Sequence, residues 1–268
     1  GHIYGLAIDV GTTTVVLNLV DLESGEIVHT GSFETPQRFG GSDTMRRISY
    51  DGGEYSGELA QVMLSSINFE IGDMARRLKV RRRHIYEAVI VGNSTMRELF
   101  FGFDVQSIGE KPYRSQVEEE FRSGERENTA LNVKASDLDL RIFPDANVYG
   151  APLVGSHIGG DIAADILATG IDESEDVVAL VDIGTNTEVI VGNRYRMLAA
   201  SCPAGPAFEG GEVTFGMPGY EGAIESVHID NDGVHFETIG GAPPEGICGS
   251  GLVDLLAELV RTKNMNEL

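Results

Sequence analysis

A short motif of Asp, Gly and Thr occurs twice in this chain and has the composition of a phosphate-binding turn. Residues 9–14 read DVGTTT and residues 182–187 read DIGTNT, and an apolar run precedes and follows each copy. Glycine lets a ligand approach the backbone closely, and successive N–H groups in such a turn form an anion-binding concavity. One copy alone would be ordinary hairpin chemistry, but two copies in matching contexts favour a nucleotide phosphate site. The candidate phosphate-binding residues are Gly11, Thr12, Thr13, Thr14, Gly184, Thr185, Asn186 and Thr187.

An aspartate stands at the head of each turn, and neither turn contains a lysine. If the two turns grip a polyphosphate from both sides, Asp9 and Asp182 face each other across it. Two carboxylates repel phosphate unless a cation lies between them, and Mg²⁺ prefers oxygen ligands while keeping several of its waters. The pattern therefore predicts a Mg²⁺ ion that Asp9 and Asp182 hold largely through water.

The elements that must position these turns alternate between strand and helix patterns. Apolar residues recur at helical spacing over residues 57–79, which predicts a long helix. Strands are expected at 3–9, 14–21, 26–34, 87–93, near 131–143, and at 177–183, 187–192, 223–230 and 234–239; helices are expected within 36–56 and at 94–102, 155–170 and 246–260. This order predicts an α/β fold with an internal duplication. A polar stretch at 170–176 marks the expected boundary, with a first lobe at residues 1–170 and a second at 171–268.

Composition excludes several classes of function. With 20 basic and 42 acidic residues the formal net charge is −22, which argues against a nucleic-acid partner and against docking on an anionic membrane. No apolar run approaches the ~20 residues of a membrane span, and Cys202 and Cys248 cannot form a disulfide framework. We therefore expect a cytoplasmic protein. His228 and His235 flank an Asn-Asp-Gly turn and are expected to be cross-strand neighbours rather than zinc ligands.

The paired Asp-x-Gly-Thr hairpins resemble the phosphate-1 and phosphate-2 motifs of the superfamily of acetate and sugar kinases, heat-shock chaperone ATPases and actin. That resemblance implies duplicated ribonuclease-H-like lobes with ATP in the cleft between them. The stretch DIAADILATG (161–170) is similar to the connecting helix of the chaperone ATPases, which runs from an acidic residue through small residues to a Gly. The resemblance implies that Asp161 orients or deprotonates the attacking water and that Asp9 and Asp182 belong to the same catalytic centre. An Asp favoured by the helix macrodipole is the alternative for Asp161.

Over most of its length the chain resembles a narrower family, the ATP-dependent reductive activators of corrinoid proteins. This resemblance implies that ATP and Mg²⁺ are cofactors and that the partner is a corrinoid protein whose cobalt is returned from Co(II) to Co(I). It also implies that electrons come through an iron–sulfur cluster in a separate domain of the same polypeptide, and it suggests a homodimer. The stretches that carry the resemblance are GLAIDVGTTTVV (5–16), TPQRFGGSDTMRRISY (35–50), AVIVGNSTM (88–96), GSHIGGDIAADILATG (155–170), LVDIGTNTEVIVGN (180–193), SCPAGPAFEGGEV (201–213) and GICGSGLVDLL (246–256).

The chain departs from that family in two respects. It contains no set of cysteines for a cluster, and after residues 246–260 it has no Gly-Ala-Phe-Gly-like segment for the adenosine. We therefore expect the iron–sulfur domain to lie outside this chain and the second lobe to be incomplete. PAGPAFEGG (203–211) resembles the Gly-rich phosphate-side loop of the second lobe, which adds Gly205 to the candidates, although a plain Pro/Gly turn is an equal alternative.

Other interpretations stay open at this point. The glycines of GICGSG (246–251) present N–H groups to an anion or permit close helix packing, and packing is favoured. The basic stretch ARRLKVRRR (75–83) is either a solvated helix end, which the macrodipole favours, or a docking site for an acidic partner. A small-molecule kinase of the same fold is the main alternative function, with residues 36–56 lining its substrate pocket, and an actin-like filament protein is a third.

Overall fold

The computed structural model describes residues 2–205, 213–230 and 232–266, and the chain divides into two compact units. Unit 1 comprises Gly1–Asp182 and Glu188–Ser201, and unit 2 comprises Ile183–Thr187 and Cys202–Leu268. The expected lobe boundary between residues 170 and 171 rests on the polar stretch at 170–176, and it stays a prediction. Each unit is described by itself below.

Unit 1 contains most of the regular elements. Its strands are β1 (Tyr4–Val10), β2 (Thr14–Asp21), β3 (Ile27–Glu34), β4 (Ile85–Val91), β5 (Leu131–Lys134) and β6 (Asn147–Gly150), followed by most of β7 (Val178–Ile183), β8 (Asn186–Asn193) and β9 (Arg196–Pro203). Its helices are η1 (Pro36–Gly40), α1 (Thr44–Asp51), α2 (Glu58–Arg77), η2 (Arg82–His84), α3 (Ser94–Phe100), α4 (Gln106–Gly109), α5 (Gln116–Arg122), η3 (Ala135–Leu138) and α6 (Gly160–Thr169).

A six-stranded sheet in the order β3-β2-β1-β4-β6-β5 forms the centre of unit 1. β1 pairs antiparallel with β2 and parallel with β4, and β4 in turn pairs parallel with β6. The carboxyl ends of β1, β4 and β6 therefore share one edge of the sheet, the edge at which α/β folds usually bind ligands.

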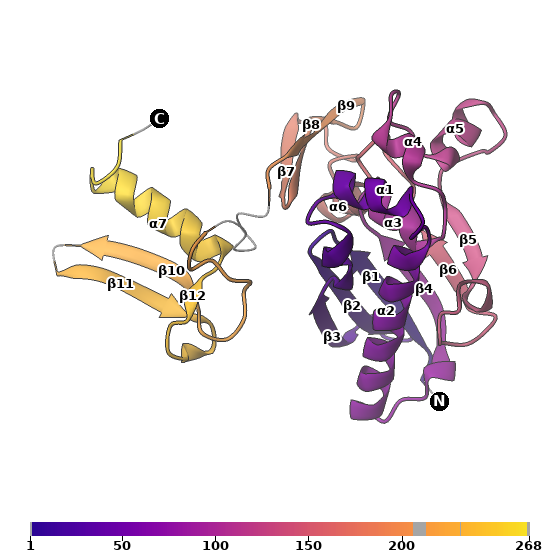
Figure 1. The fold of residues 1–268 in the computed structure, drawn as a ribbon, viewed down its shortest axis with the longest axis horizontal. Coiled ribbons are helices and arrows are strands. Elements are labelled where there is room, and N and C mark those ends of the chain that lie inside the picture. The colour runs from indigo at the N-terminus through magenta and orange to yellow at the C-terminus, as the bar shows by residue number, and fades with distance from the viewer. Residues whose placement is uncertain (1, 206–212, 231, 267–268) are drawn as a thin grey trace. The chain divides into compact units, whose positions relative to one another are not determined.

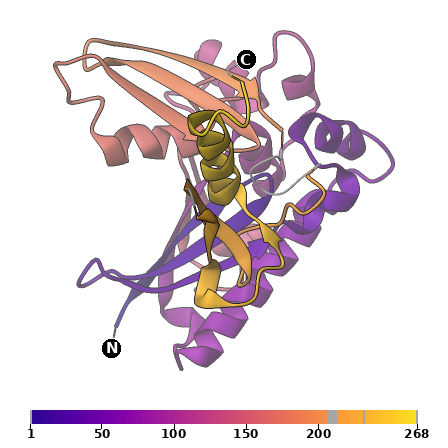
Figure 2. The same ribbon diagram turned by 90° about the vertical axis from the view of Figure 1, so that its left-hand side faces the viewer.

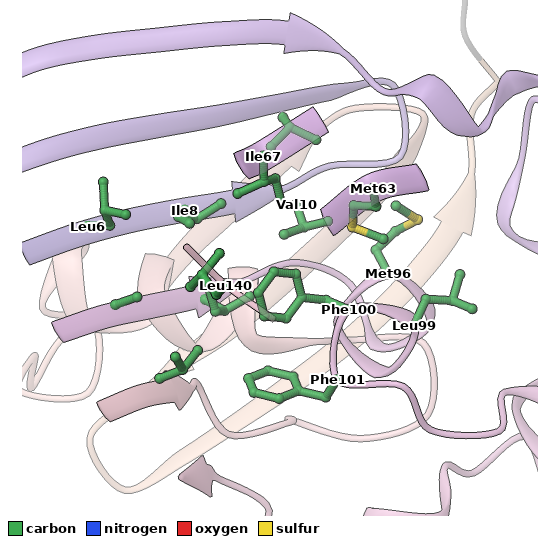
Figure 3. Close-up of a cluster of buried hydrophobic side chains, with 14 of the residues drawn as sticks. Leu6, Ile8, Val10, Met63, Ile67, Met96, Leu99, Phe100, Phe101 and Leu140 are labelled. Atoms are coloured by element: carbon green, nitrogen blue, oxygen red, sulfur yellow. The ribbon is translucent and has the colours of Figure 1, made fainter. Parts of the chain in front are cut away.

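The main core lies between this sheet and the helices α2 and α3 (Figure 1). Period-two alternation places Leu6, Ile8 and Val10 of β1 on the core face. The apolar residues of α2 recur every three to four positions, which predicts its buried stripe correctly. Figure 3 shows the β1 residues beside Met63 and Ile67 of α2, Met96, Leu99, Phe100 and Phe101 of α3 and its C-terminus, and Leu140.

A second, smaller core holds α6 in place. β7, β8 and β9 form a three-stranded sheet in that order. Within unit 1 the buried residues Ile158, Ile162, Ile171 and Ile190 pack together with Ile166, Val178, Leu180 and Met197. The inward faces of β7 and β8 therefore rest against α6, the helix that carries Asp161.

Unit 2 consists of a small sheet and one helix. β10 (Ala223–Asp230) and β11 (Gly233–Thr238) form an antiparallel pair that places His228 opposite His235, as predicted, and β12 (Gly246–Ile247) pairs with the other edge of β10. The turn η4 (Ile239–Gly241) follows β11. Figures 1 and 2 show α7 (Gly249–Arg261) lying along β10. A Cβ on Gly251 would stand 2.2 Å from the carbonyl oxygen of Ile224, which supports the packing role of GICGSG.

Several elements differ from the sequence-based expectations. β6, β9 and α5 were not predicted. β6 and α5 are short, with four and seven residues, and β9 has eight residues but its sequence RMLAASCP lacks the strict apolar–polar alternation that marks a strand. The predicted helix 155–170 begins only at Gly160, since Gly155 and Ile158 form a β-bridge and Ser156 has a φ of 52°. In the described part of the chain, none of the helices combines the length and apolar character needed to cross a membrane.

Candidate functional site

The first Gly-Thr turn is held rigidly between β1 and β2. A Cβ on Gly11 would stand 2.4 Å from the carbonyl oxygen of Thr14, so only glycine fits at this bend. The buried Thr12 hydroxyl accepts a hydrogen bond of 2.9 Å from Asn93 Nδ2, and the Thr35 N–H donates to the Thr13 carbonyl at 2.8 Å. Because the Thr12 hydroxyl accepts one bond, its own proton is left to be donated elsewhere. The turn is therefore fixed from two sides before any ligand arrives.

Three backbone segments meet beside this turn with room for glycine only. A Cβ on Gly92, which follows β4, would lie 2.7 Å from the Val10 carbonyl oxygen, and its φ of 150° also favours glycine. A Cβ on Gly159, at the start of α6, would lie 2.2 Å from the Gly92 carbonyl oxygen and 2.5 Å from two backbone atoms of Asn93. The Gly160 N–H donates to the Gly92 carbonyl at 2.9 Å. These contacts seat the N-terminus of α6 at the carboxyl ends of β1 and β4.

This packing collects five carboxyl groups within unit 1. Asp9 alternates with the core residues of β1, so its side chain lies on the opposite face of the sheet. Asp161 and Asp165 lie one turn apart on α6, while Asp182 of β7 and Glu188 of β8 lie on the inward strand faces that pack against that helix. We call Asp9, Asp161, Asp165, Asp182 and Glu188 the carboxylate cluster.

The electrostatics of the cluster differ strongly from those of free carboxyl groups. Burial, followed by the charges of Asp182 and Asp165, raises the pKa of Asp9 to about 6. Burial raises the pKa of Asp161 to about 7; the Ile162 N–H, which donates to Asp161 Oδ1 at 2.8 Å, opposes that rise, and the charges of Glu188, Asp9 and Asp182 add to it. A carboxylate with a pKa near the working pH is well suited to accept and release a proton.

The remaining three groups are shifted in the same direction. Burial is the largest cause for each, and it raises the pKa values of Asp165, Asp182 and Glu188. The charge of Asp182 adds to the rise for Asp165 and Glu188. Glu188 is only 4% exposed, and the hydrogen bond that its Oε1 accepts from Ser201 Oγ at 2.8 Å opposes its rise in pKa. The cluster is thus a site where like charges repel one another in partial isolation from water.

Such a donor set fits Mg²⁺ held through water. All five groups offer oxygen, the element that Mg²⁺ prefers, and a divalent cation would offset their mutual repulsion. Among the described residues, the only group of three or more His, Cys, Asp or Glu with ligand atoms within 4.8 Å of one another is His2, Asp21 and Glu23, which lies outside the cluster. Three side chains of the cluster therefore do not meet around one point in the part of the chain that the structure describes.

The second turn belongs to unit 2. Gly184 donates its N–H to the Asn186 carbonyl at 3.1 Å, and a Cβ on Gly184 would lie 3.2 Å from that oxygen, so the demand for glycine is weaker than at Gly11. The N–H groups of Ala204 and Gly205 both donate to the Thr185 carbonyl, at 3.1 and 3.0 Å. Gly205, with a φ of 81°, thus lies directly beside the second turn. Residues 206–212, which complete the predicted Gly-rich loop, lie outside the described residues.

The structure accordingly brings together the three aspartates named from the sequence. Asp9, Asp161 and Asp182 lie in one electrostatically coupled cluster of unit 1, and Gly11, Thr12, Thr13 and Thr14 form the turn that follows Asp9. Gly184, Thr185, Asn186 and Thr187 form the second turn with Gly205 beside it.

Sequence analysis missed Asp165 and Glu188. Both carried a recognisable signal: Asp165 is four residues after Asp161 on a predicted helix, which puts the two on one face. Glu188 is the single charged residue in the apolar run that follows the second turn. Neither signal identifies a site residue until α6 and β8 are known to pack together.

Comparisons with known proteins agree with this geometry. The family model described as the RACo middle region matches residues 4–174, and the one described as the C-terminal domain of RACo, the ASKHA domain, matches residues 176–268. The corrinoid activation enzyme RamQ of Eubacterium limosum is 34% identical over 261 residues, which are 97% of this chain and 42% of that protein. The Co(II) methylated amine-specific corrinoid protein reductase of Methanosarcina barkeri is 24% identical over 232 residues, 82% of this chain and 40% of that protein.

A solved structure extends the agreement to three dimensions. A reductive activator for corrinoid, iron-sulfur protein superposes with a TM-score of 0.88 at 40% identity, over 98% of this chain and 41% of that one. This chain thus spans about two fifths of the length of each of these relatives. The ASKHA match confirms the predicted fold of the actin, sugar-kinase and chaperone ATPase type. Since the two family models together match the chain from residue 4 to residue 268 with a single residue between them, the resemblance stated from the sequence is confirmed, and the chain belongs to the RACo family.

Proposed function

We propose that this chain is the ATP-binding and ATP-hydrolysing module of a reductive activator that restores Co(I) in corrinoid proteins. The observation that carries this proposal is the carboxylate cluster beside a rigid Gly-Thr turn, in a chain of the RACo family. Relatives whose names describe corrinoid activation and Co(II) reduction support the choice of reaction over phosphoryl transfer to a metabolite.

The turns bind the phosphates of ATP in this proposal. The N–H groups of Gly11, Thr12 and Thr13 and the hydroxyls of Thr12 and Thr14 act on one side of the polyphosphate. Residues 184–187 supply the second phosphate-binding turn in this proposal, with Gly205 in support. Backbone N–H groups in such turns are fixed donors that need no reorganisation when an anion arrives.

Asp9 and Asp182 hold Mg²⁺ through its waters. The bound ion would neutralise charge on the phosphates. Asp161 orients the attacking water and accepts its proton, a role for which a pKa of about 7 is suited. Glu188 helps to keep that pKa high because its charge adds to the rise, whereas the charge of Asp165 acts on Asp9 and raises the pKa of Asp9.

ATP hydrolysis then drives an otherwise unfavourable one-electron transfer. An iron–sulfur domain of the same polypeptide, outside this chain, donates one electron to the corrinoid Co(II), which becomes Co(I). The cobalt-bearing partner docks on the activator during this step, and the activator acts as a homodimer in the cytoplasm.

The test uses the full-length activator with its corrinoid protein. Wild-type protein should release free phosphate faster when the Co(II) corrinoid protein is present, and Co(I) should appear in its absorption spectrum. Asp9→Ala should abolish Mg²⁺-dependent ATP binding in a titration, and Asp161→Ala should retain binding while hydrolysis slows about 100-fold or more, the usual loss for a general base. A phosphorylated small molecule instead of free phosphate would assign a kinase, and unchanged ATP affinity in Asp9→Ala would refute the two-turn site.

A further inference from the structure

One end of unit 1 carries a concentration of positive charge that the nucleotide site does not use. The chain has a net charge of −22, yet six of its 20 lysines and arginines lie between residues 76 and 83, where α2 ends and η2 begins. Arg76 and Arg77 pair with Asp73. Within the described part of the chain, the other four have no ion pair, and all four are exposed: Lys79, Arg81, Arg82 and Arg83.

A groove lies along the same helix, α2, on the N-terminal side of this charge in sequence. It has a cavity volume of about 1010 Å³ and runs between α2 and the segment 136–144. Asn68 fixes its wall, since Asn68 Nδ2 donates to the Asp139 carbonyl at 2.9 Å and Asn68 Oδ1 accepts from the Arg141 N–H at 2.6 Å. Phe69, in the lining, is 71% exposed. The groove is thus preformed and combines an exposed aromatic ring with the guanidinium-bearing residue Arg141.

The groove and the basic segment form one surface. Phe69, Asp73 and Arg76 follow one another at i, i+4 and i+7 along α2, so they share a helix face. On the other side, the Phe143 N–H donates to the Ile85 carbonyl at 3.1 Å, which brings segment 136–144 against the strand that directly follows the basic segment. We call residues 76–83 together with this groove the basic-end surface; α2, along which it lies, is shown in Figure 1.

We propose that the basic-end surface docks an acidic face of the corrinoid protein, with an apolar side chain of that partner seated in the groove against Phe69. Arginine and aromatic residues are enriched where partner proteins bind. The rest of this acidic chain repels an acidic partner, so a localised positive patch selects the encounter orientation and raises the association rate. The same net charge disfavours a nucleic acid here. The identity of the partner rests on the proposed function, whereas the chemistry of the surface rests on the structure.

The experiment supplies the full-length activator with ATP, Mg²⁺ and a chemical reductant for its iron–sulfur cluster. It measures the initial rate of Co(I) formation against the concentration of the corrinoid protein, at about 50 and about 300 mM salt. Two variants alter the basic-end surface, and both change exposed side chains, so folding should be preserved. A matched control removes three exposed positive charges elsewhere in unit 1. The variants are Arg81→Gln/Arg82→Gln/Arg83→Gln and Phe69→Ala, and the control is Arg46→Gln/Lys111→Gln/Arg196→Gln.

Both variants should raise the KM for the corrinoid protein about tenfold at low salt, the size typical of interface anchors. Their kcat at saturating partner and their ATP hydrolysis without partner should stay at the wild-type level. The triple arginine variant should also lose most of the salt dependence of KM, and the control should behave as wild type. An unchanged KM in both variants, or an equal rise in the control, overturns the inference.

Other outcomes separate this inference from the function on which it rests. If the wild-type protein forms no Co(I), the proposed function and the identity of the partner fail together. If Co(I) forms normally and KM does not respond to the variants, only the docking surface is wrong. Tight binding of a fluorescent oligonucleotide at about 150 mM salt, abolished in the triple arginine variant, would assign the surface to nucleic acid and overturn the proposal.

Discussion

Replacing Asp161 by Asn should stabilise the ligand-free protein, and the gain should grow with pH. The pKa of Asp161 is raised from 3.8 to about 7, so the folded state holds this proton more tightly than the unfolded state does. The folded state is therefore favoured at low pH, and that advantage is lost as the pH rises from about 4 to about 7. Asn keeps the size of the side chain and can still accept the hydrogen bond from Ile162, but it has no charge to bury.

The magnitude follows from the same shift. A difference between 3.8 and about 7 corresponds to at most about 4 kcal/mol, at 1.36 kcal/mol for each pH unit. Asp161 keeps part of its surface in water, and the other carboxylates can release their own charge by taking up protons. We therefore expect about half of that ceiling, ~2 kcal/mol of added stability at pH 8 and less than ~1 kcal/mol at pH 5.

Urea unfolding followed by far-UV circular dichroism at both pH values measures this gain without Mg²⁺ or nucleotide. The exposed Asp172→Asn, just beyond the end of α6, serves as the control and should change stability by less than ~0.5 kcal/mol. If Asp161→Asn is no more stable than wild type at pH 8, the carboxylate cluster does not carry the electrostatic strain described above. A stabilised but inactive variant would show that the site retains this repulsion for function.

Three further outcomes can be measured. Gly159→Ala should lower the free energy of unfolding by about 1–3 kcal/mol, because the new Cβ would stand 2.2 Å from the Gly92 carbonyl oxygen. The control Gly72→Ala lies within helix α2, where the new Cβ would meet only one side-chain atom, at 3.7 Å, and it should raise the free energy of unfolding by about 0.5–1 kcal/mol. Equal effects of the two substitutions in urea unfolding would show that the clash at residue 159 is relieved at no cost. Asn93→Ala removes both the hydrogen bond to Thr12 and the N-terminal cap of α3. We therefore expect the free energy of unfolding to fall by about 1 kcal/mol and calorimetry to show weaker ATP binding. An unchanged ATP affinity would show that the first Gly-Thr turn does not need the bond from Asn93. Mg²⁺ alone should raise the melting temperature by mass action. The rise should be larger at pH 8 than at pH 5, because more carboxylates of the cluster are ionised at pH 8. An equal rise at both pH values would contradict the assignment of the ion to the carboxylate cluster.

Much of the candidate site was predictable because its signals are local. A Gly between two apolar runs predicts the bend at Gly11. The position of Asp9 near the end of a buried strand predicts that its carboxylate is held rigidly beside that bend. The long helix α2 was visible in the spacing of its apolar residues. Each of these inferences needs only neighbours within one or two turns of chain.

Other features depended on long-range packing that no local pattern reveals. α6 begins at Gly160 rather than at residue 155, because the backbone before it turns through a β-bridge and then packs on Gly92. Glu188 joined the site only because the inward face of β8 packs against α6. The continuity of the basic segment with the groove at Phe69 likewise depends on segment 136–144 lying beside α2.

The amino-acid sequence by itself determined which chemical groups this protein has available: two Gly-Thr turns, an aspartate at each, a helix that opens with an acid, and membership of a family of ATPase-type proteins. Only the tertiary structure decided their chemistry. The carboxyl of Asp161 has a pKa of about 7 because backbone segments distant in sequence pack so closely, through Gly92 and Gly159, that four other carboxylates share its partly dry surroundings. Electrostatic energy depends on distance and on access to water, and both are properties of the packed fold rather than of any stretch of chain.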